Sequence, residues 1–427
     1  MLERAVLVHI NFTDPDRQAD ADELRQLVTS AGLDIVATVT ASRDRPDARC
    51  FIGSGKVGEL ADVVKSAAAD VVIFNHVLSP AQERNLEKHC QCKVIDRVRL
   101  ILDIFAQRAL SYEGKLQVEL AQLQHLTTRL IRGWTHLERQ KGGIGLRGPG
   151  ETQLETDRRL IGRRIKSIRQ RLERVKSQRN QGRRLRERSD VPTVALIGYT
   201  NAGKSTLFNA LTGADVLAAD KLFATLDPTL RRLELPDGPY AVISDTVGFI
   251  KQIPHDLIEA FHATLQEVQG ADLLLHVVDI NDEQRLQHTE QVNRVIEDLG
   301  AERIPQLTVF NKIDRHESIS GPSVQRDNTG KADRVMVSAM TGEGLELLTR
   351  AIADRLAEGD SQHQLLLPVT ASKLRSQLFA AGAIRHEEAV AEGGWILDVS
   401  MDAGKLQYLC RLSGLEHTSL QRHNCKL

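Results

Sequence analysis

The chain has few cysteines, and they form no pattern. Only five of its 427 residues are cysteines, at positions Cys50, Cys90, Cys92, Cys410 and Cys425. Five cysteines are few for a chain of this length, and their number is odd, which argues against the disulfide framework of a small secreted protein. Cys90 and Cys92 lie next to His89, but no second ligand pair follows at the spacing of a zinc site, so we expect ordinary reduced thiols.

Long apolar runs are also missing. No stretch approaches the roughly 18 apolar residues that a membrane-spanning helix needs. The N-terminus, with Glu3 and Arg4, lacks the core of a signal peptide. We therefore expect a cytoplasmic protein without a transmembrane segment. Apolar residues make up 41% and charged residues 26% of the chain, which excludes a fibrous or fully disordered protein.

An excess of one charge is absent overall but present locally. The 56 basic and 57 acidic residues give a net charge of -1, which excludes a uniformly basic nucleic-acid-binding protein. Residues 158–188, however, hold 14 Lys or Arg and only two acids, Glu173 and Glu187, a local charge of +12. This one-sided run favours phosphate binding over a merely solvated helix face. Because aromatic residues are only 4% of the chain, base stacking is poorly supplied, and we expect recognition of the shape and backbone of folded RNA.

Periodicity divides the chain into four predicted domains. Residues 1–108 and 191–358 alternate short apolar runs with helical patterns, which predicts two α/β domains, the second with a doubly wound sheet. Residues 109–190 are predicted to be helical, and residues 363–427 a small C-terminal α/β domain whose role the sequence does not reveal. In the first domain, the strand-like runs are Ala5–Val8, Leu33–Thr40, Cys50–Ile52 and Val71–Phe74.

The helical domain carries two apolar seams. Its buried positions are spaced alternately four and three residues apart, first from Leu116 to Leu137 and again from Ile161 to Val175. This spacing predicts an antiparallel hairpin of two helices packed as a coiled coil. The glycine-rich stretch 142–150 is the predicted tip, where Arg147 is available to a phosphate.

A phosphate-binding pattern follows the predicted strand Val194–Ile197. Its members are Gly198, Tyr199, Thr200, Asn201, Ala202, Gly203, Lys204 and Ser205. Glycines let the backbone turn its N–H groups toward a phosphate, and the helix that begins there adds the positive end of its dipole. We expect Lys204 to neutralise the β- and γ-phosphates and the Ser205 hydroxyl to bind Mg²⁺.

A second motif follows the predicted strand Ala241–Ser244. Its members are Asp245, Thr246, Val247 and Gly248. A carboxylate at Asp245 can hold the shell of the Mg²⁺ ion, and the N–H of Gly248 can bind the γ-phosphate.

Two further motifs predict the choice of base. They are Asn311, Lys312, Ile313 and Asp314, and then Ser338, Ala339 and Met340. A carboxylate at Asp314 can accept hydrogen bonds from guanine N1–H and from the 2-amino group. Adenine would leave it unpaired, at a cost of about 1–3 kcal/mol or more. Backbone donors at Ser338 to Met340 can bind guanine O6. Because the four motifs follow successive strands, they should meet at one sheet edge and bind GTP or GDP.

With these residues in place, the chain resembles the HflX family of ribosome-associated GTPases, a group of the translation-factor class. The resemblance covers nearly the whole chain and implies a first switch at residues 223–229, of which Phe223, Ala224, Thr225, Leu226 and Asp227 would bind the nucleotide. There Thr225 would bind Mg²⁺ once the γ-phosphate is present, although Thr229 is an alternative on chemical grounds. The catalytic contacts would then be those of Lys204, Thr225 and Gly248.

Two positions of the nucleotide motifs stay open. Many GTPases place a water-orienting Gln directly after the Asp-x-x-Gly motif, where this chain has Phe249. Hydrolysis should therefore be slow without help from a partner or another group. Asn201 matches a position at which some related GTPases bind K⁺, and the alternative is a neutral asparagine that caps the loop.

Two other glycine-rich segments resemble nucleotide-binding patterns. Residues 53–58 fit G-x-G-x-x-G, but Cys50 and Val57 stand where a Walker loop needs Gly and Ser or Thr. A structural turn is the simpler interpretation, while the family resemblance implies a possible ATP site in this region. Residues 143–148 follow a helix instead of a strand, so the cofactor interpretation fails there.

These patterns together predict a GTPase that binds the large ribosomal subunit, through its RNA, in the GTP state, and that is monomeric when free. The resemblance further implies splitting or rescue of stalled ribosomes under stress. A GTP-dependent ribosome assembly factor is one alternative, and an ATP-driven RNA-remodelling enzyme that uses the N-terminal domain is another.

Overall fold

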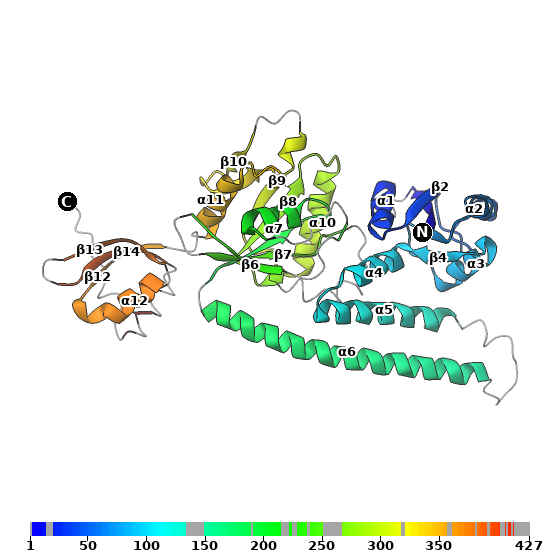
Figure 1. The fold of residues 1–427 in the computed structure, drawn as a ribbon, viewed down its shortest axis with the longest axis horizontal. Helices are drawn as coiled ribbons and strands as arrows, with labels where there is room; N and C mark the ends of the chain where they lie inside the picture. The colour runs from blue at the N-terminus through cyan, green and yellow to red at the C-terminus, as the bar shows by residue number, and fades with distance from the viewer. Residues whose placement is uncertain are drawn as a thin grey trace.

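The computed structural model describes most of the chain. The described residues are 2–13, 20–133, 149–188, 191–214, 222–223, 229–236, 240–250, 267–316, 321–356, 361–380, 382–390, 393–401, 406, 409–410 and 413. Three separate sheets and a long helical hairpin make up the molecule, and Figure 1 shows the three sheets side by side with the hairpin along one edge. None of the helices in these ranges is long and apolar enough to cross a membrane.

The N-terminal sheet is parallel and has the strand order β2-β1-β3-β4. Its strands are β1 (Arg4–Phe12), β2 (Asp34–Arg43), β3 (Val71–Phe74) and β4 (Lys93–Asp96). The helices between and after them are α1 (Ala21–Ser30), α2 (Ser54–Ser66), α3 (Pro80–Cys90) and α4 (Arg97–Arg108). Side-chain caps at Asp20, Ser79 and Asp96 satisfy the first N–H groups of α1, α3 and α4 and so fix where these helices begin.

One predicted strand of this domain is wrong. The run Cys50–Ile52 forms only an isolated bridge, in which Asp47 and Phe51 exchange two backbone hydrogen bonds. Phe51 has a left-handed φ of 64°, which turns the chain back on itself. The run is apolar because Cys50, Phe51 and Ile52 are buried in the core beneath the sheet, and burial alone does not distinguish a turn from a strand.

The predicted helical hairpin is present. Helix α5 spans Tyr112–Gly133 and α6 spans Pro149–Arg188, so the 40 residues of α6 extend about 60 Å at 1.5 Å per residue. The seam lies where the spacing placed it: Leu116, Leu120 and Ile168 are buried together. Trp134 and Leu137 lie outside the described residues. The tip was predicted to run to Gly150, but α6 already begins at Pro149, a residue suited to the first helical turn.

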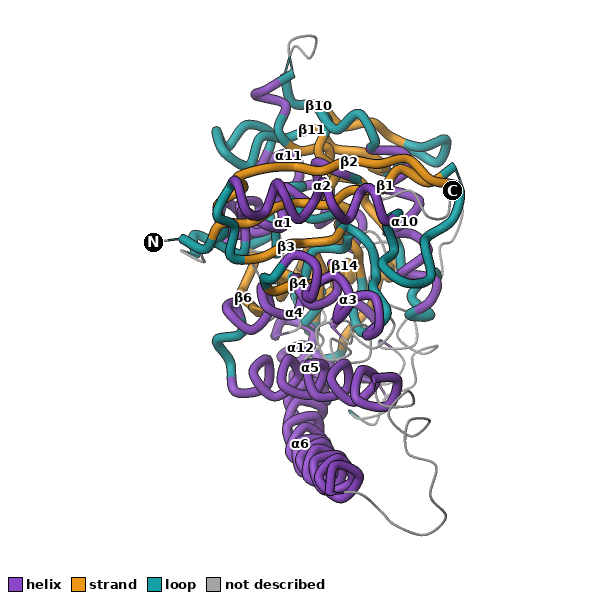
Figure 2. The backbone as a smooth tube through the Cα atoms, turned by 90° about the vertical axis from the view of Figure 1, so that its right-hand side faces the viewer, coloured by secondary structure: helices purple, strands orange, loops and turns teal. Residues whose placement is uncertain are grey.

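Ion pairs attach the hairpin to the N-terminal domain. Arg129 of α5 pairs with Glu83 of α3 and, at 2.7 Å, with the fully buried Asp96. Burial raises the pKa of Asp96 despite the cationic groups around it. Arg164 of α6 in turn forms two hydrogen bonds, of 2.6 and 2.9 Å, with Glu119 of α5. Helix α5 therefore lies between α6 and the N-terminal sheet, as Figures 1 and 2 show from two sides.

The central sheet has seven strands in the order β10-β11-β9-β8-β5-β7-β6. They are β5 (Thr193–Ile197), β6 (Thr229–Leu233), β7 (Ala241–Asp245), β8 (Leu273–Asp279), β9 (Gln306–Asn311), β10 (Ser323–Arg326) and β11 (Ala332–Met336). The two outermost strands, β6 and β10, are antiparallel to their neighbours and the others are parallel. Helices α7 (Lys204–Thr212), α10 (Arg285–Asp298) and α11 (Leu345–Leu356) flank the sheet, together with the short η3 (Ile313–Arg315).

The central sheet is buried on both faces, as a doubly wound sheet should be. Along β5, Val194 and Leu196 face one apolar core while Ala195 and Ile197 face another. The second of these cores does not end at the central domain, because it continues into Leu27 of the N-terminal domain. The predicted multidomain α/β fold is thus confirmed, while the exact domain limits stay predictions.

The last sheet has three antiparallel strands in the order β12-β14-β13. They are β12 (Ser361–Leu367), β13 (Ile384–Ala389) and β14 (Trp395–Met401), and α12 (Ser372–Ala380) packs on them after the short η5 (Val369–Ala371). Most of residues 402–427 of the predicted C-terminal domain lie outside the described residues.

Candidate nucleotide site

The four motifs meet at the carboxyl-terminal edge of the central sheet. The first turns sharply after β5, with left-handed or glycine-only backbone at Gly198 (φ 144°), Asn201 (φ 61°) and Gly203 (φ 91°). A Cβ atom at Gly198 would stand 2.2 Å from the carbonyl oxygen of Val277. A Cβ at Gly203 would stand 2.3 Å from Nδ2 of Asn311. Only glycine fits both positions, which accounts for the glycines of the motif.

The side chain of Lys204 folds back over this loop. Its Nζ donates to the carbonyl oxygens of Gly198 at 3.1 Å and of Tyr199 at 2.8 Å. Lys204 is buried, and burial lowers the pKa of its amine to about 8, against the opposing influence of Asp245. Within the described part of the chain its hydrogen bonds go to carbonyl oxygens, which carry no full charge, and the phosphates of a nucleotide would supply the negative charge that a buried ammonium needs.

Ser205 and Asp245 lie together beside the loop. The Ser205 hydroxyl donates to Oδ2 of Asp245 at 2.8 Å, and Asp245 is fully buried at the end of β7. A hydroxyl and a carboxylate are hard oxygen donors of the kind that Mg²⁺ prefers. The pair therefore fits the magnesium site that the motifs predict.

The Asp-x-x-Gly motif is tied to the phosphate loop through its neighbour, Phe249. The Phe249 N–H donates to the Gly198 carbonyl at 3.2 Å, and its own carbonyl accepts from the Thr200 N–H at 2.8 Å. A Cβ at Gly248 would stand 3.0 Å from Nζ of Lys204, so this glycine lies directly against the lysine. Phe249 itself is 4% exposed and faces the apolar core, where it has no access to a hydrolytic water.

The two base-recognition motifs are joined to the loop and to each other. Asn311 Nδ2 donates to the Ala202 carbonyl at 3.0 Å, and its Oδ1 accepts from the Ala339 N–H at 3.0 Å. The Ser338 hydroxyl donates to Oδ1 of Asp314 at 2.5 Å, which orients that carboxylate. Ser338 is buried, Ile313 is buried, and Met340 is 76% exposed.

Lys312 links the same pocket to a residue that the motifs do not include. Its Nζ donates to the Asn201 carbonyl at 2.8 Å and pairs with Asp279 at 2.8 Å. Asp279 ends β8, so its place at the sheet edge follows from the strand, but its partner could not be assigned from sequence. The structure thus gathers residues 198–205, 245–248, 311–314 and 338–340 at one edge.

The predicted first switch is described in part. Residues 224–228, and with them Thr225 and Asp227, lie outside the described residues. Phe223 is 2% exposed, and its ring packs against Phe105 of α4 with the centroids 4.6 Å apart. The N–H of Leu222 donates to the Ser30 hydroxyl of α1 at 2.9 Å. The start of this segment is therefore fixed to the N-terminal domain.

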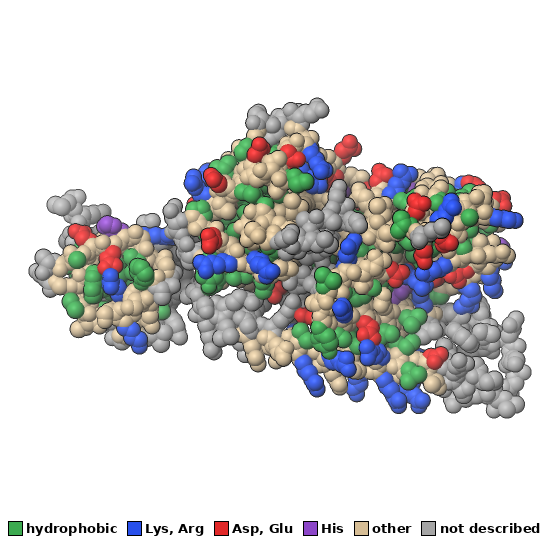
Figure 3. Space-filling view, in the orientation of Figure 1, with side chains coloured by type: hydrophobic (Ala, Val, Ile, Leu, Met, Phe, Trp, Pro, Cys, Tyr) green, Lys and Arg blue, Asp and Glu red, His purple; other side chains and the backbone are tan. Residues whose placement is uncertain are grey.

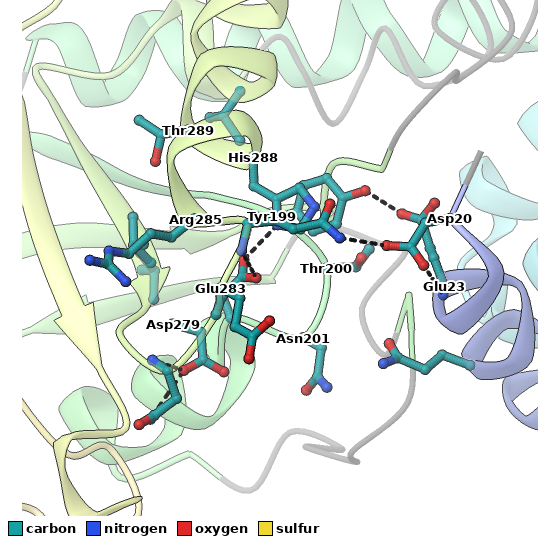
Figure 4. A pocket seen from close by; sticks show the side chains of 18 of the residues that line it. Asp20, Glu23, Tyr199, Thr200, Asn201, Asp279, Glu283, Arg285, His288 and Thr289 are labelled. Carbon is teal, nitrogen blue, oxygen red and sulfur yellow. Dashed lines mark hydrogen bonds and ion pairs between the residues drawn. The ribbon is translucent and has the colours of Figure 1, made fainter. Parts of the chain in front are cut away.

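Sequence reasoning missed a cavity of about 330 Å³ beside the phosphate loop. It lies between Tyr199 to Ala202, the start of α10 and the start of α1, and dashed lines in Figure 4 join the central domain to Asp20 and Glu23 across it. His276 lines its base, and burial together with the charge of Lys204 lowers the pKa of that imidazole to about 4. No local motif marks this cavity, because part of its wall, Asp20, Asp22, Glu23 and Gln26, comes from the N-terminal domain.

Family models match the chain in three consecutive parts. One described as GTP-binding GTPase N-terminal matches residues 18–106, and one described as GTP-binding GTPase Middle Region matches residues 108–186. A third, described as 50S ribosome-binding GTPase, matches residues 193–312.

Individual proteins are similar over nearly the whole length. GTPase HflX of Escherichia coli (strain K12) is 56% identical over 409 residues, 96% of this chain and 96% of that protein. GTPase HflX of Magnetococcus marinus is 47% identical over 390 residues, 90% of this chain and 89% of that protein. A solved structure of a GTP-binding protein from Sulfolobus solfataricus in complex with GDP is 22% identical, covers 84% of this chain and 99% of that chain, and has a TM-score of 0.44.

Proposed function

Since the chain belongs to the HflX family of GTPases, we propose that it binds the large ribosomal subunit in its GTP state through the basic helix α6 and leaves after hydrolysis. The protein is a GTPase with a ribosome-binding GTPase domain. The observation that carries the proposal is the surface of α6, where every basic side chain that the structure describes is exposed.

The exposed basic residues of α6 are distributed along its surface outside the seam. They are Arg158, Arg159, Arg163, Arg164, Lys166, Arg169, Arg171, Arg174 and Lys176. Only Asp157 and Glu173 oppose them along the same stretch. Figure 3 shows the blue side chains along the margin of the molecule that α6 forms. A surface that carries mostly positive charge suits the phosphates of RNA. The ion pair of Arg129 with Asp96 attaches α5 to the N-terminal domain, and that of Arg164 with Glu119 attaches α6 to α5, so the position of the basic surface is fixed.

We assign the hydrolytic chemistry to the motif residues. Lys204 would neutralise the β- and γ-phosphates, Gly248 would donate its N–H to the γ-phosphate, and Asp314 would select guanine. Ser205, Asp245 and, in the GTP state, Thr225 would hold Mg²⁺, which neutralises charge on the phosphates when bound. Asn201 is the candidate K⁺ ligand, and its role as a loop cap remains the alternative.

A partner is needed for fast hydrolysis. The side chain of Phe249 is buried at the position where many GTPases carry a glutamine that orients water. We propose that the ribosome supplies or positions the missing group, so that hydrolysis follows binding and releases the protein. Splitting or rescue of stalled ribosomes under stress, in the cytoplasm, is the physiological role that we propose for this cycle.

Cosedimentation with purified large subunits tests the proposal. We expect binding with a non-hydrolysable GTP analogue and weaker binding with GDP. Affinity should fall steeply as salt increases, since a protein that neutralises ~6 or more phosphates loses about a thousandfold or more in affinity between roughly 50 and 200 mM salt. The triple variant Arg163→Glu, Arg169→Glu, Arg174→Glu should lose binding.

A matched control carries the same change in charge elsewhere. Arg294, Arg303 and Arg350 are exposed on the central domain, and their replacement by Glu should leave subunit binding nearly intact. Equal loss in both triple variants, or binding insensitive to salt, would remove α6 from the interface. Stronger binding to immature than to mature subunits would favour an assembly factor instead.

A further inference from the structure

Tyr199 has its backbone in the phosphate loop and its side chain in another domain. The carbonyl oxygen of Tyr199 accepts from Nζ of Lys204 at 2.8 Å, and Tyr199 pairs with Phe249 in an isolated parallel bridge. Its side chain, however, points toward Glu23 near the start of α1, as Figure 4 shows. The side chain therefore serves something other than direct contact with a phosphate.

The Tyr199 hydroxyl donates to a buried ion pair of the N-terminal domain. It binds Oε1 of Glu23, whose Oε2 accepts from NH2 of Arg97 at 2.5 Å. The side chains of Arg97 and Glu23 are only 3% and 7% exposed. The NH1 of Arg97 donates in turn to Oδ1 of Asn75 at 2.9 Å, and Asn75 is fully buried.

The same tyrosine is also held by its ring. His288 of α10 stacks on it, with the ring centroids 3.8 Å apart and the planes 13° from parallel. Nδ1 of His288 lies 2.5 Å from Oδ2 of Asp282, which fixes the imidazole. With its ring between two elements and its hydroxyl on a buried carboxylate, Tyr199 has little freedom to move without moving the loop.

A buried carboxylate needs all of its partners. Glu23 forms an ion pair with Arg97, and a charged group that loses a hydrogen bond in a buried site is destabilised more than an exposed one. Any displacement of the loop backbone at Tyr199 must therefore be transmitted to the Glu23–Arg97 pair or break that bond. Thermodynamic coupling of this kind acts equally in both directions.

We propose that Tyr199 is a positioning residue that couples nucleotide binding at the phosphate loop to the docking of the N-terminal domain through Glu23 and Arg97. Nucleotide binding fixes the loop, the fixed loop holds the hydroxyl on Glu23, and α1 with α4 becomes more firmly docked. Conversely, a displaced N-terminal domain loosens the loop and weakens nucleotide binding. This inference rests on the proposed role of residues 198–205 in binding phosphate, but not on any contact with the ribosome.

The test uses the full chain and the variant Tyr199→Phe, which removes only the hydroxyl. The matched control is Tyr240→Phe, because Tyr240 lies under Arg232 and directly before β7, at the end of that strand away from Asp245. We expect Tyr199→Phe to weaken the binding of a fluorescent GDP by about fivefold or more, the lower end of common coupling factors, and Tyr240→Phe to leave it unchanged. Glu23→Gln, which keeps the size of the side chain and removes its charge, should act like Tyr199→Phe.

Hydrogen exchange distinguishes coupling from a general loss of stability. GDP should slow exchange in α1 and α4 of the wild-type protein, and Tyr199→Phe should abolish most of that slowing while exchange in α12 stays the same. An equal GDP-dependent slowing in wild type and Tyr199→Phe overturns the proposal, as does faster exchange throughout the variant with the GDP-dependent difference preserved. GDP that fails to bind the wild-type protein would instead refute the nucleotide site itself.

Discussion

At the scale of single residues, Lys204 makes nucleotide affinity depend on pH. Burial holds the pKa of its amine at about 8 in the nucleotide-free protein, below the ordinary 10.5. Between these two values the unfolded chain keeps a proton that the folded protein has lost. The free energy of unfolding of the nucleotide-free protein therefore increases as pH rises from about 8 to 10.5. Below pH 8 the folded protein must bury the charged ammonium, which lowers its stability.

Nucleotide binding depends on pH in the opposite direction from stability, because the phosphates bind the protonated amine of Lys204. We expect GDP affinity to be flat from about pH 6.5 to 7.5 and to fall above pH 8 toward tenfold per pH unit, as one proton must be taken up on binding. Titrations of fluorescent GDP across this range measure the slope. Lys204→Met should bind more weakly with no slope near pH 8, and a slope that persists in this variant would assign it to another group.

Asp314 should determine the choice of base. Its carboxylate is held by the Ser338 hydroxyl at 2.5 Å, and an amide in its place would present a donor as well as an acceptor. Asp314→Asn should weaken GTP by about tenfold or more and improve the binding of xanthosine nucleotides, which carry a carbonyl in place of the 2-amino group. Competition between GTP and XTP measures the change, and an unaltered preference for GTP would refute the guanine pocket.

The sequence predicted the residues of this site because each motif is short and follows a buried strand. It could not predict Tyr199 as a link to Glu23, since 176 positions separate the two partners along the chain. It could not predict the pairing of Lys312 with Asp279 either, because the motif fixes the lysine but not the neighbouring strand end.

At the scale of elements, the seam of the hairpin should account for its rigidity. Ile168 is fully buried against Leu116 and Leu120, and Ile168→Ala would leave a cavity at a cost of about 2–5 kcal/mol. Leu160, on the same helix and 53% exposed, is the control, and its replacement by Ala should cost at most about 0.5 kcal/mol. Native-state hydrogen exchange of α5 and α6 would report the difference, and equal effects of both variants would contradict the packing.

Helices and strands were predictable where an apolar pattern repeats over many residues or where a strand is buried along its whole length. The seams of α5 and α6 and the strands β5 and β7 lie where their patterns placed them. Strands β6 and β10 were missed because edge strands are exposed and carry little apolar signal: β10 has three exposed residues of four. The turn at Cys50–Ile52 was mistaken for a strand for the converse reason, since its side chains are all buried.

At the scale of the whole molecule, the N-terminal and central domains share one apolar core. Leu27, Ile101 and Phe105 on one side and Phe223 and Phe249 on the other belong to a single buried cluster. Phe223, at the start of the predicted first switch, and Phe249, next to the Asp-x-x-Gly motif, thus belong to the same core as residues of the domain that carries the hairpin. No pattern in the sequence showed this, because each side looks like the core of its own domain.

Charge is distributed unevenly over the molecule. Residues 158–188 carry +12 and the other 396 residues carry -13. The near-neutral total is the sum of one basic helix and an acidic remainder. The negative charge of that remainder should repel RNA phosphates, so that RNA binds at the basic helix and not at other surfaces. A nucleotide-dependent change of affinity needs different contacts in the GTP and GDP states. The shared core that holds Phe223 and Phe249 also includes Val118 and Ala121 of α5, the helix on which α6 packs.

The most direct test of the whole account is the rate of GTP hydrolysis measured with and without purified large ribosomal subunits. The buried Phe249 predicts slow hydrolysis by the free protein and acceleration by roughly a hundredfold or more when subunits are added, within the range that supplied catalytic groups achieve in other GTPases. The triple arginine variant of α6 should keep the slow basal rate and lose the acceleration. Fast hydrolysis by the free protein, or a rate that subunits leave unchanged, would contradict the account.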